Sequence, residues 1–177
     1  AWQAALPALF VGVALRPSPA LFYGYTAATP PAPADVPGVT FEPIDRTLLA
    51  RADIAGSAPV RQEIGWMWPS LDLFYMQGLG QAAIADGDVV CFCTSEYVSA
   101  TLCGIGIATT PAYQRRGIAT AATQRFVAEA LRRSLTPYWE CSGENIASMR
   151  TAEKVGFALI ERATYWIGSF DSAAPQC

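Results

Sequence analysis

The stretch that decides the fold reads GIGIATTPAYQRRGIAT over residues 104–120. Residues 103–109 form an apolar run of strand length, and a turn sequence with Pro111 follows it. From Ile118 to Leu135 apolar residues recur at helical spacing, and Pro137 ends that pattern. The sequence therefore predicts a strand, a loop and a long helix in this order.

The loop has the composition of a phosphate-binding site. A helix N-terminus presents backbone N–H groups without helical partners and favours an anion. Gly117 and Ala119 have almost no side chain to obstruct a ligand, and Arg115 and Arg116 add positive charge. We expect a pyrophosphate cradle here, and the alternative is an ordinary loop whose arginines are solvated. No GxxxxGK[ST] run accompanies it, so this is not a P-loop.

Alternating strand and helix patterns extend outward from this stretch. Toward the C-terminus we expect a strand at 138–141, a helix from Asn145 to Val155 that Gly156 ends, and a strand at 159–167. Toward the N-terminus, strands at 81–85 and 89–100 flank the turn sequence of residues 86–88. Further upstream are an aromatic-rich segment at 59–77 with a break at 69–70, a helix from Asp45 to about residue 52, and strands at 39–44 and 20–27. This order predicts an α+β fold.

The chain length of 177 residues fits one main domain. Residues 1–36 are rich in Pro and Ala and are either an arm packed on that domain or the remnant of an upstream region. We place the domain at residues 37–170 and a C-terminal tail at 171–177.

Composition excludes several functions. The chain has no histidine, so catalysis by imidazole and histidine zinc sites are excluded. Its 5 cysteines form no CxxC pair, which favours buried reduced thiols in a cytoplasmic protein without a metal. A net charge of -3 argues against nucleic acid as a partner, and no apolar run is long enough to span a membrane.

The run Gln114-Arg115-Arg116-Gly117-Ile118-Ala119 resembles the Q/R-x-x-G-x-G/A signature of the GCN5-related N-acetyltransferases (GNAT). Asn145, Ser148 and the run from Glu153 to Phe157 resemble the N-x-x-A/S … E-K-x-G-F helix of the same family. The match is most similar to the branch that contains the zwittermicin A resistance acetyltransferase. The resemblance implies a mixed, mostly antiparallel twisted sheet, flanked by helices, with two central parallel strands that splay apart.

The resemblance also implies acetyl-CoA as the donor substrate and assigns residues to it. The strand end would pair with the pantetheine amides through Ile107, Ala108 and Thr109. The loop and first helical turn would surround the pyrophosphate through Gln114, Arg115, Arg116, Gly117, Ile118, Ala119 and Thr120. Asn145 and Ser148 would lie beside the pantetheine arm, and Asn145 also suits a plain helix N-cap.

Transfer to a primary amine requires a group that takes the amine's proton. Some family members carry a catalytic Glu where this chain has Glu140, and strand alternation predicts that Glu140 faces away from Trp139 and Cys141. The alternative is a solvated or ion-paired Glu. Ala152 stands where many members have a Tyr that protonates the leaving thiolate, so the sequence does not identify that acid.

The acceptor should meet the aromatic segment before the motif. Trp66 and Trp68 could line its pocket, although aromatic residues also serve as core. The expected activity is N-acetyl transfer by direct attack of a small-molecule or peptide amine, and the chain could form a homodimer. The alternative is a domain of this fold that binds acyl-CoA without turnover.

Overall fold

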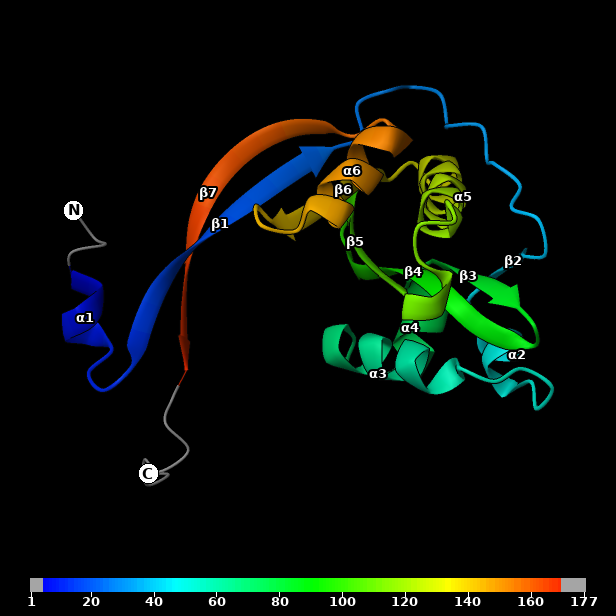
Figure 1. Ribbon diagram of the computed structural model, residues 1–177, viewed down its shortest axis with the longest axis horizontal. Coiled ribbons are helices and arrows are strands. Elements are labelled where there is room, and N and C mark those ends of the chain that lie inside the picture. Colours follow the sequence, from blue (N-terminus) through cyan, green and yellow to red (C-terminus); the bar gives the residue numbers. More distant parts are fainter. Residues whose placement is uncertain (1–4, 170–177) are drawn as a thin grey trace.

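A seven-stranded sheet runs through the molecule in the order β2-β3-β4-β5-β6-β1-β7. The computed structural model describes residues 5–169 (Figure 1). The strands are β1 (Ala14–Gly24), β2 (Thr40–Pro43), β3 (Gly80–Ala85), β4 (Asp88–Val98), β5 (Leu102–Thr109), β6 (Thr136–Ser142) and β7 (Ala158–Ser169). Every neighbouring pair is antiparallel except β5 and β6, which are parallel. The predicted mixed, mostly antiparallel α+β fold is confirmed.

Helices cover both faces of this sheet, as Figure 1 shows. One face carries α5 (Ile118–Arg132) and α6 (Ile146–Val155), and the other carries α2 (Arg46–Ala50), α3 (Ser57–Met67) and α4 (Leu71–Gln77). A short helix α1 (Leu6–Leu9) lies near the N-terminal end of β1, and a 3-10 turn, η2 (Pro111–Tyr113), precedes α5. No helix among residues 5–169 has both the length and the apolar character needed to cross a membrane.

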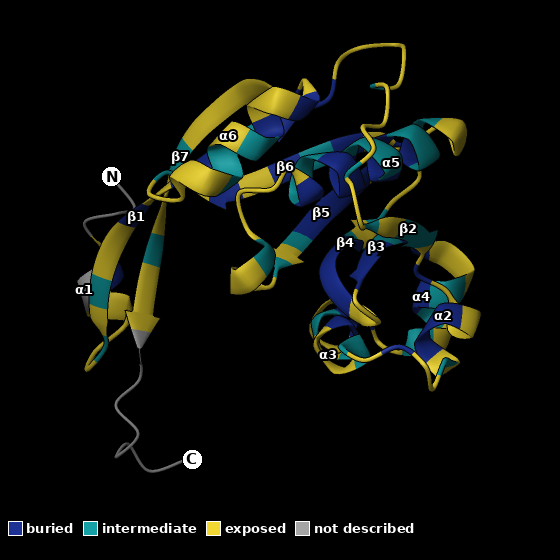
Figure 2. Cartoon of the chain, turned by 45° about the vertical axis from the view of Figure 1, so that its right-hand side comes forward, coloured by how far each residue is buried: buried dark blue, intermediate teal, exposed yellow. Residues whose placement is uncertain are grey.

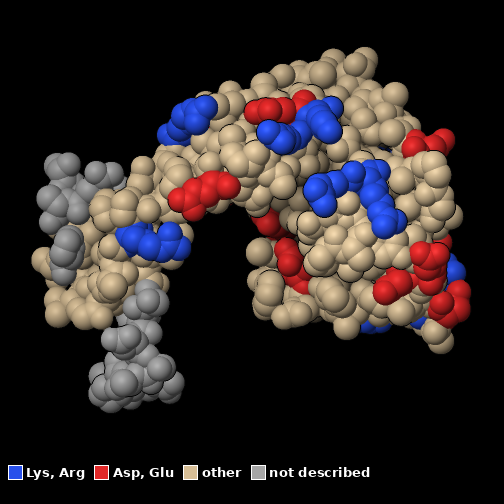
Figure 3. All heavy atoms as spheres, in the orientation of Figure 1, with Lys and Arg blue, Asp and Glu red and all other residues tan. Residues whose placement is uncertain are grey.

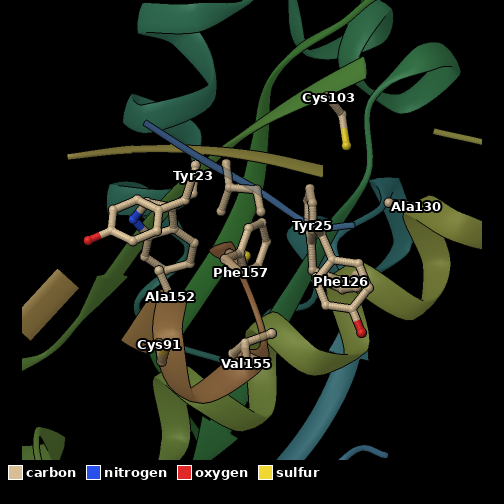
Figure 4. Packing of buried hydrophobic residues seen from close by; sticks show 14 of the residues in the cluster. Tyr23, Tyr25, Cys91, Cys103, Phe126, Ala130, Ala152, Val155 and Phe157 are labelled. Atoms are coloured by element: carbon tan, nitrogen blue, oxygen red, sulfur yellow. The ribbon is translucent and has the colours of Figure 1, made fainter. Parts of the chain in front are cut away.

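The larger core lies between the sheet and the helices α5 and α6. Figure 4 shows Phe126 and Ala130 of α5 together with Ala152 and Val155 of α6, packed near Tyr23 of β1. The burial of Ala130 agrees with the helical spacing of apolar residues expected from Ile118 to Leu135. A second core fills the space beneath α3 and α4 and includes Val60, Ile64, Trp68 and Phe74.

Helix ends follow the predicted capping residues. The Asp45 carboxylate accepts a hydrogen bond from the Leu48 N–H at 2.7 Å, although α2 ends at Ala50, earlier than expected. The break at residues 69–70 is confirmed, because Ser70 caps α4 by accepting from the Leu73 N–H at 3.1 Å.

The first strand begins earlier than predicted and lies inside the sheet. Residues 20–24 of β1 pair with β6, and the whole strand pairs with β7. Among residues 5–169, β7 is the only strand that pairs with residues 14–19, and the other edge of this segment accommodates Pro17 and Pro19. Figure 2 shows that the outer part of this ribbon is mostly exposed. The domain limits at residues 36 and 170 stay predictions, and the tail at 171–177 lies outside the described residues.

Two irregularities in the sheet position the functional site. The parallel strands β5 and β6 pair only at Leu102–Thr136, Cys103–Pro137 and Gly104–Tyr138, and beyond these pairs they separate as predicted. Beside them, the register of β4 against β5 shifts between Ser95–Ile105 and Val98–Cys103. Glu96 and Tyr97 therefore form a β-bulge opposite the single residue Gly104.

Candidate active site

A cleft of about 810 Å³ opens where α5 and α6 begin. Its walls are the end of β5, the loop before α5 and one side of α6. The lining residues predicted from the sequence are Ile107, Ala108, Thr109, Gln114, Arg115, Gly117, Ile118, Ala119, Thr120, Asn145 and Ser148. The fold thus gathers two motifs that are well separated in the sequence.

The loop before α5 presents backbone donors to this cleft. Gly117 caps the helix in the left-handed conformation at φ 81°, and a Cβ added there would meet no atom within 4 Å. The first helical hydrogen bond from this end joins the Ala121 N–H to the Gly117 carbonyl at 3.0 Å, so the N–H groups of residues 118–120 have no partner within the helix. The Gln114 side chain braces the loop by donating to the Thr109 carbonyl at 3.1 Å.

Arg116 does not line the cleft, in contrast to Arg115. Its guanidinium lies 4.9 Å from the centre of the Tyr113 ring. The Tyr113 hydroxyl donates to the Asp86 carboxylate at 2.7 Å, and this hydrogen bond raises the pKa of Tyr113. Arg116 is therefore held beside the loop, and its predicted contact with the pyrophosphate would require the guanidinium to leave the ring.

Helix α6 forms the opposite wall. The Asn145 side chain accepts from the Ser148 N–H at 3.0 Å, which confirms it as the N-cap, and the Ser148 hydroxyl accepts from the Trp139 indole N–H at 3.0 Å. Sequence reasoning missed further lining residues of this helix, namely Ile146, Ala147, Arg150, Thr151 and Lys154. The spacing of residues 147, 150, 151 and 154 is that of one helix face and could have identified them.

A second, acidic surface lies on the other face of the sheet at the point where β5 and β6 separate. Glu140 is exposed there, whereas Trp139 and Cys141 are buried on the opposite side, as alternation predicts. A Cβ added to Gly106 would lie 3.0 Å from a Glu63 carboxylate oxygen and 3.2 Å from a Glu96 carboxylate oxygen. Figure 3 shows acidic side chains within the hollow on the concave side of the molecule.

Several side chains at the acidic surface have raised pKa values. Burial, followed by the charges of Glu63 and Glu140, raises the pKa of Glu96 to about 6. Burial and the Glu140 carboxylate raise the pKa of Tyr165 to about 12, and burial also raises the pKa values of Tyr97 and Tyr138. These tyrosines keep their protons at neutral pH.

Comparison with known proteins assigns this architecture. The family model described as GNAT acetyltransferase matches residues 33–165. The chain belongs to the GNAT acetyltransferase family. An uncharacterised N-acetyltransferase of Bacillus subtilis, YdfB, is 26% identical over 129 residues, which cover 73% of this chain and 48% of YdfB. The chain thus spans about half the length of this curated relative.

Solved GNAT structures share the fold. A GCN5-related N-acetyltransferase-like protein from Streptococcus suis superposes with a TM-score of 0.69 at 18% identity, covering 95% of this chain and 68% of its own. A GCN5-related N-acetyltransferase from Sphaerobacter thermophilus gives a TM-score of 0.66 at 18% identity, covering 94% of this chain and 55% of its own. Together, the family match and the named relative support acyltransferase activity in general terms.

One position in the GNAT helix motif belongs to the core. Ala152 is fully buried among residues of α5, β1 and β6, and Figure 4 shows it in this packing. The neighbouring Thr151 lines the cleft instead. Residue 152 therefore supplies no proton donor in this GNAT domain, and the phenols whose pKa values the Glu140 carboxylate raises are those of Tyr97, Tyr138 and Tyr165.

The two tryptophans predicted to meet the acceptor have different environments. Trp68 is buried, packs edge-on against Phe74 and donates its indole N–H to the Ser95 carbonyl at 2.7 Å, so it is a core residue and not part of an open pocket. Trp66 is 69% exposed on α3. It follows Glu63 by three residues and so shares a helix face with that carboxylate. Its contact with the acceptor stays a prediction.

Proposed function

We propose that this domain transfers an acetyl group from acetyl-CoA to a primary amine by direct attack. The observation that carries the proposal is the position of the cleft and the acidic surface on either side of the separated strands β5 and β6. Donor and acceptor could then meet through the gap. The coarser conclusion, membership of an acyltransferase family, does not depend on this proposal.

The residues of the cleft suit the donor. Open space over Gly117 and the N–H groups of residues 118–120 fit a pyrophosphate, and positive charges at Arg115, Arg150 and Lys154 would hold it. Beyond residue 104, β5 separates from β6, and the edge of residues 107–109 that faces away from β4 offers backbone groups to an extended pantetheine arm. Asn145 and Ser148 would face that arm from α6.

The acidic surface suits a cationic amine. Within residues 5–169, no ion pair joins Glu63, Glu96 or Glu140 to a basic side chain. An ammonium group would compensate these charges, and loss of its proton to a carboxylate would produce the nucleophile. The sequence predicts Glu140 for that role, and the structure adds Glu63 and Glu96 as further carboxylates.

Calorimetry and a turnover assay test the proposal together. Titration should show that CoA and acetyl-CoA bind, and release of free CoA should depend on an added amine such as putrescine, glucosamine or a lysine-containing peptide. Tight binding of acetyl-CoA without turnover on any amine would instead support a non-catalytic acyl-CoA-binding module. Absence of CoA binding would overturn both assignments.

Three narrower expectations remain predictions. They are membership of the zwittermicin A resistance branch, a cytoplasmic location and a homodimer. Sedimentation at several protein concentrations would test the homodimer directly, because a dimer that dissociates changes its apparent mass with concentration.

A further inference from the structure

Three carboxylates from three different elements meet beside the gap between β5 and β6. Glu63 comes from α3, Glu96 from β4 and Glu140 from β6. The first two lie over Gly106, where a Cβ would approach both carboxylates to between 3.0 and 3.2 Å. Any side chain at residue 106 would therefore compete with Glu63 and Glu96 for the same space.

The β-bulge explains why Glu96 lies at this place. In a regular strand, consecutive side chains point to opposite faces of the sheet. Here Glu96 and Tyr97 together oppose Gly104, and both contact the same face of β5: Tyr97 lies against Gly104, and Glu96 lies over Gly106. The bulge thus directs an acidic side chain to the face that Glu140 also occupies.

We propose that Glu96 is the catalytic base that accepts the proton of the acceptor's ammonium group. This inference rests on the acetyl transfer proposed above. Glu96 is half-buried and is acted on by the charges of Glu63 and Glu140, whereas Glu140 itself is exposed. Glu63 and Glu140 are positioning residues in this arrangement, because their charges attract the cation and favour the protonated form of Glu96.

The proton and bond changes balance without a further reactant. One proton passes from the ammonium group to Glu96, which later returns it to solvent. The free amine then attacks the acetyl carbon, so that a C–N bond forms and the C–S bond breaks. The second proton lost by the nitrogen ends on the CoA sulfur, and the products are the N-acetyl amine and CoA thiol.

The surroundings of Glu96 also favour this role at neutral pH. A general base works best when its pKa lies near the operating pH, and burial together with two neighbouring carboxylates raises the pKa of Glu96 to about 6. The titratable groups around it are Glu63 on α3, Tyr97, Cys93 and Glu140 with Tyr138. Tyr97, Tyr138 and Cys93 have raised pKa values and stay neutral, so Glu63 and Glu140 supply the charge that acts on Glu96.

Rate profiles against pH test the inference with the full chain, acetyl-CoA and whichever of putrescine, glucosamine and a lysine-containing peptide is acetylated fastest. The rate of the wild-type protein should fall below about pH 6, as Glu96 becomes protonated. Glu96→Gln should lower kcat by roughly 10²–10⁴-fold and remove this acidic limb. Glu63→Gln and Glu140→Gln should each retain the limb but move it to lower pH, because loss of a negative neighbour lowers the pKa of Glu96.

Two controls separate the possible failures. Glu42→Gln, on the edge strand β2, should leave the rate profile unchanged, and CoA titration and thermal melting should show that all variants bind donor and fold. If Glu96→Gln keeps the wild-type profile, or if Glu140→Gln alone loses the acidic limb, Glu96 is not the base, although acetyl transfer stands. If the wild-type protein acetylates no amine, the proposed function fails and this inference fails with it.

Discussion

Gly117 combines a left-handed backbone with open space above its Cα atom. A carboxylate introduced there would lie at a helix N-terminus, where it would take the place of a bound phosphate. We therefore expect Gly117→Glu to weaken CoA binding by at least roughly 100-fold, the loss of about two charge-assisted hydrogen bonds. Calorimetry with CoA measures the change.

Gly38 provides a matched control for that substitution. It also has a positive φ, of 74°, and nothing within 4 Å of an added Cβ, but it does not line the cleft. Gly38→Glu imposes the same backbone strain and the same charge. It should leave CoA affinity unchanged. Equal losses of CoA affinity in the two variants would contradict the assignment of the Gly117 loop as a pyrophosphate cradle.

The adjacent arginines should differ in their effect on CoA. Arg115 lines the cleft, whereas the Arg116 guanidinium lies over the Tyr113 ring. Arg115→Ala should weaken CoA binding roughly tenfold at low ionic strength and less at high salt, because salt screens an exposed charge. Arg116→Ala should have the smaller effect. Dissociation constants measured at two salt concentrations would decide, and a larger loss for Arg116→Ala would show that its guanidinium moves to the phosphate.

At the scale of single elements, Asn145 both caps helix α6 and lines the cleft. Asn145→Ala removes the hydrogen bond to the Ser148 N–H and should reduce the free energy of unfolding by about 0.5–2 kcal/mol. Asn145→Asp keeps that cap but brings a negative charge to the cleft. It should retain stability and lose CoA affinity.

Urea unfolding and CoA titration of both Asn145 variants separate the two roles. A loss of stability without a loss of affinity in Asn145→Ala would assign the residue to capping alone. Unchanged affinity in Asn145→Asp would show that this end of α6 does not approach an anionic part of the ligand.

Local sequence patterns predicted the elements that local interactions determine. The spacing around Gly117 and the cap at Asn145 predicted α5 and α6 as helices, whereas their meeting at one cleft was implied by the resemblance to the GNAT family. The acidic surface could not be predicted in the same way, because Glu63 and Glu96 meet over Gly106 only through helix packing and a β-bulge. Trp68 likewise packs against Phe74 and donates its indole N–H to the Ser95 carbonyl, and a count of aromatic residues does not reveal these contacts.

For the whole molecule, the inner and outer halves of the β1–β7 ribbon should contribute differently to stability. Leu21 is 3% exposed and belongs to the main core, whereas Leu15 lies in the outer half, which pairs with β7 and with no other strand of the described part of the chain. Leu21→Ala should therefore lower the free energy of unfolding by about 2–5 kcal/mol. Leu15→Ala should cost less than about 1 kcal/mol.

Denaturant unfolding of these two variants also tests the limit expected at residue 36. A large loss in Leu21→Ala would assign the inner half of β1 to the folding unit of the domain. Equal small losses of unfolding free energy at both positions would instead show that β1 belongs to an arm separable from the domain.

The pairing of β1 with β7 has a consequence for how the chain folds. It joins Ala14 to Ser169, and all the other strands, β2 to β6, lie between these two residues in the chain. Contacts between such distant residues slow folding, because the entropy of closing the intervening chain is lost before the contact forms. Until β7 arrives, β1 has an unpaired edge open to strands of other chains. We therefore expect the ribbon to close last, and refolding at high protein concentration to lose material to aggregation at this edge.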